Sequence, residues 1–265
     1  MGFGSWLVSV SIASAAVFSA AFAQSTPPPN GFLKEAKADQ PATQPPKPVK
    51  VLSPEMRGDI FMARKMYREA AEAYQEGGSS AVMLNKTGIA YHQMLDLGVA
   101  EKYYKKAIKA DPKYSEAINN LGTVYYARKS YRHAVNEYKK ALRLAPDSAS
   151  VWSNLGTGYF ARREYKRAAE AFQKALALNP DVFEIRSTQG VLLQERSVEE
   201  RAKYHFYLAE TYAKAGLNDR AMLYIRKALE EGYKEKKKFE EDPAFAALKD
   251  LPEFKELMAL EPRVL

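Results

Sequence analysis

Residues 149–182 read ASVWSNLGTGYFARREYKRAAEAFQKALALNPDV, and the same pattern recurs in 115–148 and again in 81–114. Its positions in this stretch are Trp152, Leu155, Gly156, Tyr159, Ala168, Phe172, Ala175 and Pro180. One period earlier they are Ile118, Leu121, Gly122, Tyr125, Ala134, Tyr138, Ala141 and Pro146, and two periods earlier Leu84, Thr87, Gly88, Tyr91, Ala100, Tyr104, Ala107 and Pro112. A fixed period of this length predicts a solenoid of stacked helix pairs instead of a compact enzyme with one cleft.

The pattern positions resemble the signature of the tetratricopeptide repeat, which residues 149–182 match at all eight places. The resemblance implies an all-α fold, a right-handed α-solenoid of stacked antiparallel helix pairs that form a superhelix, closed by short C-terminal capping helices. We expect a divergent N-terminal helix pair at 55–80, three clear repeats at 81–114, 115–148 and 149–182, divergent repeat-like helices at 183–233, and a charged connector with a C-terminal cap at 234–265.

Small residues at fixed places in each repeat predict where two helix backbones approach closely. They are Gly88, Gly122 and Gly156 on the first helices and Ala100, Ala134 and Ala168 on the second helices. A bulkier side chain there would push the helices apart at a cost of roughly 1–3 kcal/mol. Because the residue before a proline disfavours helical backbone, helices should stop ahead of Pro112, Pro146 and Pro180.

The flanking segments carry weaker versions of the pattern. Upstream positions are Gly58, Phe61, Ala70 and Tyr74, and downstream positions are Gly190, Leu208, Tyr212, Ala221, Ile225 and Ala228. Gly190 predicts another first helix, and Gly216 fits a helix C-cap after Val198–Ala215. In the tail, Pro243 and Pro252 suit first-turn positions. Helically spaced apolar residues follow them, namely Phe245, Leu248, Phe254, Leu257 and Met258.

The N-terminal segment 1–23 has the pattern of a signal peptide. Leu7–Ala23 is an uncharged apolar run that ends in Ala21-Phe22-Ala23, the small-x-small pattern of a signal-peptidase site. No Lys or Arg precedes the run, so an uncleaved N-terminal anchor is the alternative. We therefore expect an exported protein, periplasmic or secreted, or else one held at the inner membrane by that anchor.

Residues 24–54 contain eight prolines and predict a disordered linker. Proline at this density supports neither a helix nor a sheet ladder and favours an extended spacer. The chain has no cysteine, which excludes disulfides, thiolate metal sites and a cysteine nucleophile. Stability should therefore come from helix packing alone.

The positive charge of the chain is concentrated in its repeats. The formal net charge is +8, and residues 97–180 hold 16 Lys or Arg against 7 Asp or Glu. Lys106, Lys140 and Lys174 fall at one equivalent position per repeat and predict a ladder on the convex face. Such lysines commonly keep an exposed helix soluble. The alternative is contact with anionic lipid, acidic glycan or an acidic partner.

Polar and aromatic residues recur at the first-helix positions that, by resemblance to the family, hold ligands in the concave groove. They are Asn85, His92, Asn119, Asn120, Thr123, Tyr126, Ser153, Asn154, Thr157 and Phe160. A carboxamide can donate to and accept from one peptide unit, so the set suits an extended peptide of a partner protein. The alternative is structural, with the amides bridging neighbouring helices and the rings packing between repeats.

No catalytic, metal or cofactor site is expected. The three histidines, His92, His133 and His205, are widely separated in the chain and lie outside any metal-binding or nucleophile motif. No nucleic-acid reading module is present either. We expect a non-catalytic scaffold or adaptor in envelope assembly or secretion. The alternatives are a membrane-associated protein that binds anionic lipid or glycan, and a regulatory subunit of an envelope enzyme. The oligomeric state is not predicted.

Overall fold

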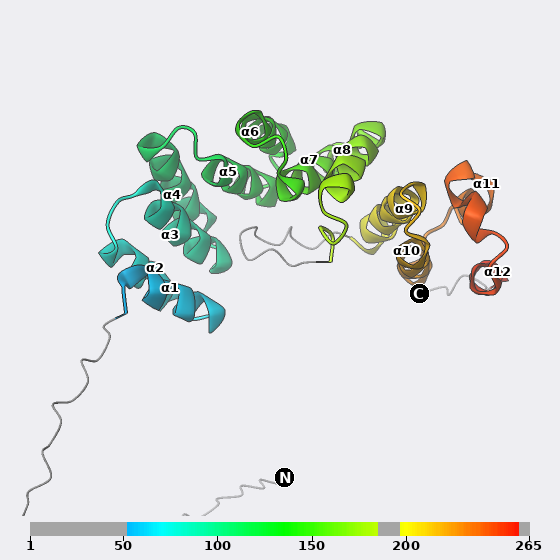
Figure 1. Ribbon diagram of the computed structural model, residues 1–265, viewed down its shortest axis with the longest axis horizontal. Coiled ribbons are helices and arrows are strands. Elements are labelled where there is room, and N and C mark those ends of the chain that lie inside the picture. Colours follow the sequence, from blue (N-terminus) through cyan, green and yellow to red (C-terminus); the bar gives the residue numbers. More distant parts are fainter. Residues whose placement is uncertain (1–51, 185–196, 260–265) are drawn as a thin grey trace, which may run out of the picture. The chain divides into compact units, whose positions relative to one another are not determined.

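The computed structural model describes residues 52–184 and 197–259, and this part of the chain is helical and contains no β-strand (Figure 1). The paired helices are α1 (Pro54–Ala63) and α2 (Tyr67–Glu76), α3 (Ala81–Gln93) and α4 (Leu97–Ala110), α5 (Ser115–Ala127) and α6 (Tyr131–Leu144), α7 (Ala149–Ala161) and α8 (Tyr165–Leu178), and α9 (Val198–Lys214) and α10 (Asn218–Glu230). The short helices α11 (Lys237–Glu241), η1 (Pro243–Leu248) and α12 (Pro252–Ala259) follow. Each pair contacts the next, so the fold is the all-α solenoid that the repeat predicts.

The boundaries of the helices follow from local chemistry. Helices α4, α6 and α8 each end just before the proline of their repeat, as the sequence predicts. At the other end of the array, Ser53 caps α1 because its Oγ accepts a hydrogen bond from the Met56 amide at 3.2 Å. Pro54 occupies the first turn of α1, so that helix begins one residue before the expected segment 55–80.

A glycine on the first helix of each pair lies against a ring on the second. A Cβ at Gly122 would lie 2.6 Å from a ring carbon of Tyr138 and 3.3 Å from the Ala134 carbonyl oxygen. The rings of Tyr104, Tyr138 and Phe172 have no exposed surface. Only glycine leaves room for such a ring at these places, which is the close approach that the sequence predicts.

The turns inside the pairs contain a feature that the sequence does not reveal. In the first four pairs one residue of the turn has positive φ without being glycine, at Lys65, Leu95, Lys129 and Arg163. At Lys129 φ is 59°, and the next amide, that of Ser130, donates to the Tyr125 carbonyl at 2.8 Å. This is the hydrogen-bond pattern of a Schellman C-cap, and it closes the first helix and reverses the chain in a short turn.

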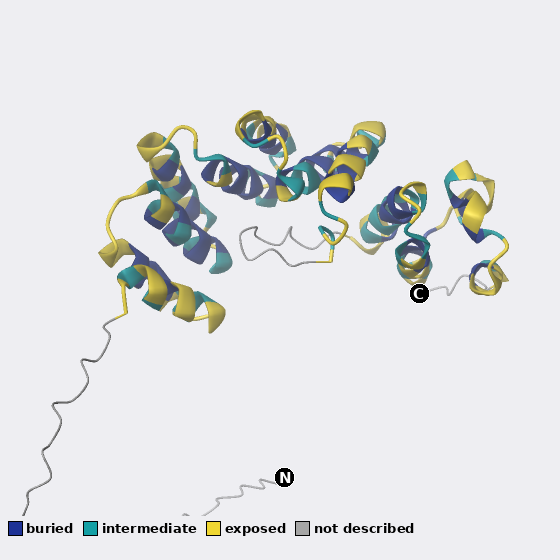
Figure 2. Cartoon of the chain, viewed as in Figure 1, coloured by how far each residue is buried: buried dark blue, intermediate teal, exposed yellow. Residues whose placement is uncertain are grey.

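The C-terminal pair repeats this design and is then covered by the tail. Gly216 has φ of 72°, and the following amide of Leu217 donates to the Tyr212 carbonyl at 3.0 Å, which confirms the expected C-cap. Pro243 and Pro252 begin η1 and α12, as expected for first-turn prolines. The side chains of Phe239, Phe245 and Leu248 are wholly buried, and the ring of Phe239 lies 5.1 Å from that of Phe206 in α9. Figure 2 shows how buried and exposed residues are distributed along the helices. Phe239 lies in the charged run, where the sequence analysis expected only a connector.

Some predictions lie outside the described residues. They are the signal peptide at 1–23, nearly all of the linker at 24–54 and the first helix expected at Gly190. Within 52–184 and 197–259, none of the helices combines the length and the hydrophobicity that a crossing of the lipid bilayer requires.

Candidate functional site

The ten residues predicted to bind a partner lie on the first helices α3, α5 and α7, and most of them are buried. The buried members are Asn85, His92, Asn119, Asn120, Thr123, Tyr126, Thr157 and Phe160. Ser153 and Asn154 are half-buried. The structure therefore brings these side chains together along one row of helices and leaves little of their surface open.

The four asparagines form a continuous hydrogen-bonded row, which we call the asparagine chain. The Asn154 amide donates to Asn119 Oδ1 at 3.0 Å, and Asn119 in turn donates to Asn120 Oδ1 at 3.4 Å. Asn120 then donates to Asn85 Oδ1 at 3.0 Å, and Asn85 donates to the Tyr114 hydroxyl at 3.3 Å. Each junction between the three clear repeats is thus bridged by one pair of carboxamides.

The two threonines of the set satisfy their own helices. Thr123 Oγ1 donates to the Asn120 carbonyl at 2.8 Å, and Thr157 Oγ1 donates to the Ser153 carbonyl at 2.9 Å. Buried hydroxyls that bond backward within a helix are already paired and need no ligand. The amide and hydroxyl contacts are those of the structural alternative, whereas partner binding at these positions stays a prediction.

The ring positions of the set pack inside the solenoid. Phe160 lies edge-on to Tyr204 and Tyr207 of α9, with ring centroids 5.4 and 5.8 Å apart, so it links the third repeat to the C-terminal pair. Tyr126 lies 5.1 Å from Tyr131 in the same repeat. Helix α8 also contacts α9, so the C-terminal pair packs against the third repeat.

His92 occupies the same position as Tyr126 and Phe160 but is titratable. Its ring is 1% exposed, its Nδ1 lies 3.5 Å from the Tyr104 hydroxyl, and burial lowers its pKa to about 4. In the unfolded chain the imidazole has its ordinary pKa near 6.5. Stability linked to His92 is therefore complete above about pH 6.5 and is lost as the pH falls toward 4.

Replacing this histidine should reduce the acid sensitivity of the fold. We expect the free energy of unfolding of the wild type to fall by about 2 kcal/mol more than that of His92→Met between about pH 7 and about pH 4.5. Met62 holds the matching position in α1, so methionine fits this place in a repeat. Urea unfolding at the two pH values measures the difference. Equal losses in both proteins would show that His92 does not titrate as a buried base.

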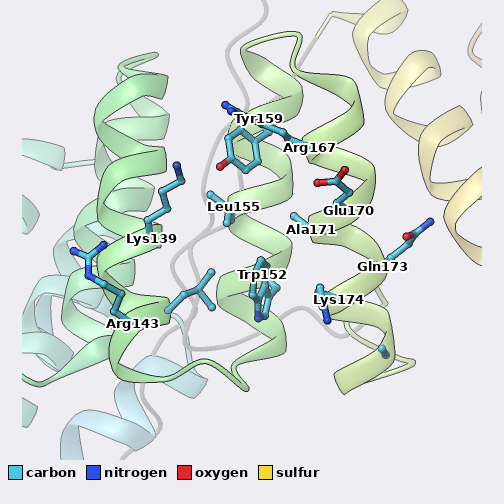
Figure 3. A pocket seen from close by; sticks show the side chains of 12 residues that line it. Lys139, Arg143, Trp152, Leu155, Tyr159, Arg167, Glu170, Ala171, Gln173 and Lys174 are labelled. Carbon is cyan, nitrogen blue, oxygen red and sulfur yellow. The ribbon is translucent and has the colours of Figure 1, made fainter.

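A groove opens on the other side of the first helices, between the second helices α6 and α8 with α7 as its floor (Figure 3). We call it the second-helix groove; its volume is about 940 Å³. It is lined by Lys139, Leu142 and Arg143 of α6, Trp152, Leu155 and Tyr159 of α7, and Arg167, Glu170, Ala171, Gln173, Lys174 and Ala177 of α8. Trp152 is half-buried, and its Nε1 donates to the Pro146 carbonyl at 2.7 Å, which fixes the indole in place.

The walls of this groove are mainly basic. Lys139 from α6 and Arg167 from α8 each lie 5.7 Å from the centroid of the Tyr159 ring, so cations from both walls meet one aromatic ring. Arg167 also pairs with Glu164 at 2.7 Å. Among the described residues, Lys139, Arg143 and Lys174 have no carboxylate partner. Trp152 and Tyr159 are pattern residues of the repeat and Lys174 is part of the predicted ladder, but their spacing in the sequence does not predict that they share one groove.

The predicted lysine ladder is exposed but not uniform. Lys106, Lys140 and Lys174 all lie on the exposed faces of second helices. Lys106 lies over the Tyr103 ring at 5.0 Å, and Lys140 pairs with Glu137 at 2.6 Å. Of the three, Lys174 alone faces the second-helix groove without a carboxylate, within the part of the chain that the structure describes.

The remaining histidines, His133 and His205, belong neither to the predicted set nor to the lining of the second-helix groove. Within residues 52–184 and 197–259, no group of three His, Asp or Glu side chains is placed to hold a metal ion. His133 is exposed with its Nδ1 2.9 Å from Ser130 Oγ, and His205 lies 2.8 Å from Glu231. Burial lowers the pKa of His205, whose contact with Glu231 joins α9 to the end of α10.

Comparison with known proteins gives three matches to family models. One described as TPR repeat matches residues 122–161, and two described as Tetratricopeptide repeat match residues 82–114 and 149–182. No curated protein sequence matches the chain. Two crystal structures of MamA share 22% and 23% identity with it, cover 66% and 70% of it and 93% and 92% of their own chains, and give TM-scores of 0.46 and 0.45. A MamA structure from Desulfovibrio magneticus RS-1 has 22% identity, covers 66% of this chain and 90% of its own, and gives a TM-score of 0.45. The family matches fall on helices α3 to α8.

Proposed function

Because the chain is a tetratricopeptide-repeat protein, a scaffold for protein–protein interaction, we propose that it is an exported, non-catalytic adaptor. In this proposal a segment of a partner protein docks on the repeats α3 to α8, and the pathway served is envelope assembly or secretion. The observation that carries it is the second-helix groove, which is open, built from repeat positions and large enough for several side chains of a peptide.

The two faces of the repeats support the proposal unequally. The second-helix groove presents charged and aromatic side chains, and among the described residues its Lys139, Arg143 and Lys174 have no carboxylate partner. On the opposite face the amides of the asparagine chain are hydrogen-bonded to one another across the repeat junctions. Of the predicted set only Ser153 and Asn154 are half-buried, and the other members are buried. A partner would therefore find most of its contacts between α6 and α8, with the Asn154 end of the first-helix face as the second candidate surface.

The exported location is supported by the N-terminal segment 1–23 of the sequence. The apolar run Leu7–Ala23 with its Ala21-Phe22-Ala23 end fits cleavage after Ala23. Cell fractionation followed by N-terminal sequencing of the protein tests this directly. A periplasmic or secreted chain that begins at Gln24 would support it, and an intact N-terminus in the membrane fraction would indicate the uncleaved anchor instead.

Affinity capture from envelope extract at physiological salt tests the adaptor function. It compares the wild type with Lys139→Glu/Lys174→Glu on the second-helix groove and with Ser153→Ala/Asn154→Ala on the first-helix face. A partner recovered by the wild type and lost by one variant would identify the docking surface. Recovery by both variants would contradict docking on α6 to α8, and no recovery by the wild type would contradict the adaptor function.

A further inference from the structure

The second-helix groove has a counterpart one repeat earlier, and the two differ in charge. The counterpart is a groove of about 490 Å³ between α4 and α6, above α5. Its residues Lys105, Ile118, Leu121, Tyr125 and Lys140 correspond, one period on, to Lys139, Trp152, Leu155, Tyr159 and Lys174. The same backbone positions therefore build both grooves, so any difference between them lies in the side chains.

In the earlier groove the lysines are neutralised within the protein. Lys105 pairs with Glu101 at 2.6 Å, and Lys140 pairs with Glu137 at 2.6 Å. In the later groove the residue one period after Glu137 is Ala171, and the residue one period after Glu101 is Val135. Neither Lys139 nor Lys174 therefore has the carboxylate that its counterpart pairs with, and among the described residues neither forms an ion pair.

The apolar part of the groove also differs. Where the earlier groove has Ile118, the later one has the half-buried Trp152, whose ring is fixed by its hydrogen bond to the Pro146 carbonyl. Aromatic side chains held in this way are typical anchor sites for an apolar side chain of a bound peptide. Lys139 and Arg143 stand on one wall beside it, and Lys174 stands on the other (Figure 3).

From this arrangement we infer that the second-helix groove binds an acidic protein segment, with an apolar side chain against Trp152 and carboxylates on the basic walls. The charge of the groove supports this occupant, because Lys139, Lys174 and Arg143 have no carboxylate partner in the described chain and share the groove with one acid, Glu170. Of the three, Arg143 also lines the earlier groove. The inference rests on the proposed function and adds the chemistry of the partner. Fixed positive charge selects acidic segments chiefly by rejecting basic ones.

The test measures binding of labelled peptides to the full chain by fluorescence anisotropy. The probe is a peptide with four glutamates around two central leucines; one control has lysines in place of the glutamates, and another has serines in place of the leucines. We expect a dissociation constant on the order of micromolar for the probe. The lysine peptide should not bind, and the serine peptide should bind more weakly. Equal binding of all three would overturn the inference.

The two grooves supply a matched pair of variants. Lys139→Gln/Lys174→Gln should weaken the probe about tenfold, since it removes two exposed charge contacts. Lys105→Gln/Lys140→Gln changes the net charge equally at the equivalent positions and should leave binding unchanged. Equal weakening by both would indicate a response to net charge alone and would overturn the site. If both double variants bound anionic phospholipid vesicles more strongly than they bound the probe, the peptide site would also be overturned, in favour of a surface that binds lipid.

The result separates the partner chemistry from the adaptor function. A captured partner that depends on Lys139 and Lys174 but docks a segment without acidic residues would leave the adaptor function standing and remove this inference. If the probe bound with the expected pattern across the variants but the wild type captured no envelope protein, the inference about an acidic segment would stand and the adaptor function would fall.

Discussion

Tyr138→Ala is expected to lower the free energy of unfolding by about 3–5 kcal/mol, the largest effect of any single substitution proposed for this chain. The ring of Tyr138 is wholly buried and fills the space left open by Gly122, so its removal leaves a cavity between α5 and α6. Residues from the next repeat also pack there, because a Cβ at Gly158 would meet Val135 at 2.9 Å and Tyr138 at 3.6 Å. The loss should therefore extend over two repeats.

Tyr138→Phe is the matched control and should cost nothing. Among the described residues the Tyr138 hydroxyl has no hydrogen-bond partner, although it is buried. Removing a buried unsatisfied hydroxyl should be neutral or should stabilise by up to about 1 kcal/mol. Phe172 holds the equivalent place in the next repeat, which shows that phenylalanine fits it. Urea unfolding followed by circular dichroism measures both variants, and a large loss in Tyr138→Phe would show that the hydroxyl is bonded.

Asn120→Ala should have the second largest effect, a loss of about 2–4 kcal/mol. Asn120 is 1% exposed and holds the centre of the asparagine chain, so its removal leaves the Asn85 carbonyl and the Asn119 amide without partners. Each buried polar group left in this way costs about 1–3 kcal/mol. The same measurement of urea unfolding applies.

Asn154→Ala provides the comparison at the half-buried end of the asparagine chain. It unpairs only the Asn119 carbonyl, at a place that water can reach, and should cost about 1 kcal/mol or less. If Asn120→Ala left stability unchanged but abolished binding of a captured partner, the asparagines would be ligand contacts and the structural account of the chain would fail. A loss of stability alone would assign them to the junctions between repeats.

Much of the fold could be predicted from the sequence because its decisive contacts repeat. The recurrence of Gly122 and Tyr138 at fixed positions of the repeat predicts the contact between a helix backbone and a ring, and Pro146 predicts where α6 ends. The non-glycine residues with positive φ, such as Lys129, could not be predicted, because the turn imposes that conformation on whichever residue stands there. Phe239 was missed because charged residues surround it in the sequence on both sides.

The site was harder to predict than the fold. The first-helix face was identified as a row of equivalent residues, but periodicity cannot tell whether an amide faces a ligand or its neighbour. A signal was present in the numbering: Asn85 and Asn120, like Asn119 and Asn154, are separated by one position more than the repeat period, so each pair joins two different positions of adjacent repeats. The second-helix groove was not predicted because three helices from two repeats contribute to it.

This offset makes residues 115–148 a unit that can be copied. Helix α5 alone carries both amides, so its Asn120 bonds backward to Asn85 and its Asn119 bonds forward to Asn154, at 3.0 Å in each case. A duplicate of 115–148 inserted after Ser148 would present the correct asparagine at both of its boundaries. The gene could therefore lengthen this array by tandem duplication of one segment, whereas α3, with Lys86 at the second position, and α7, with Ser153 at the first, would interrupt the row wherever they were copied.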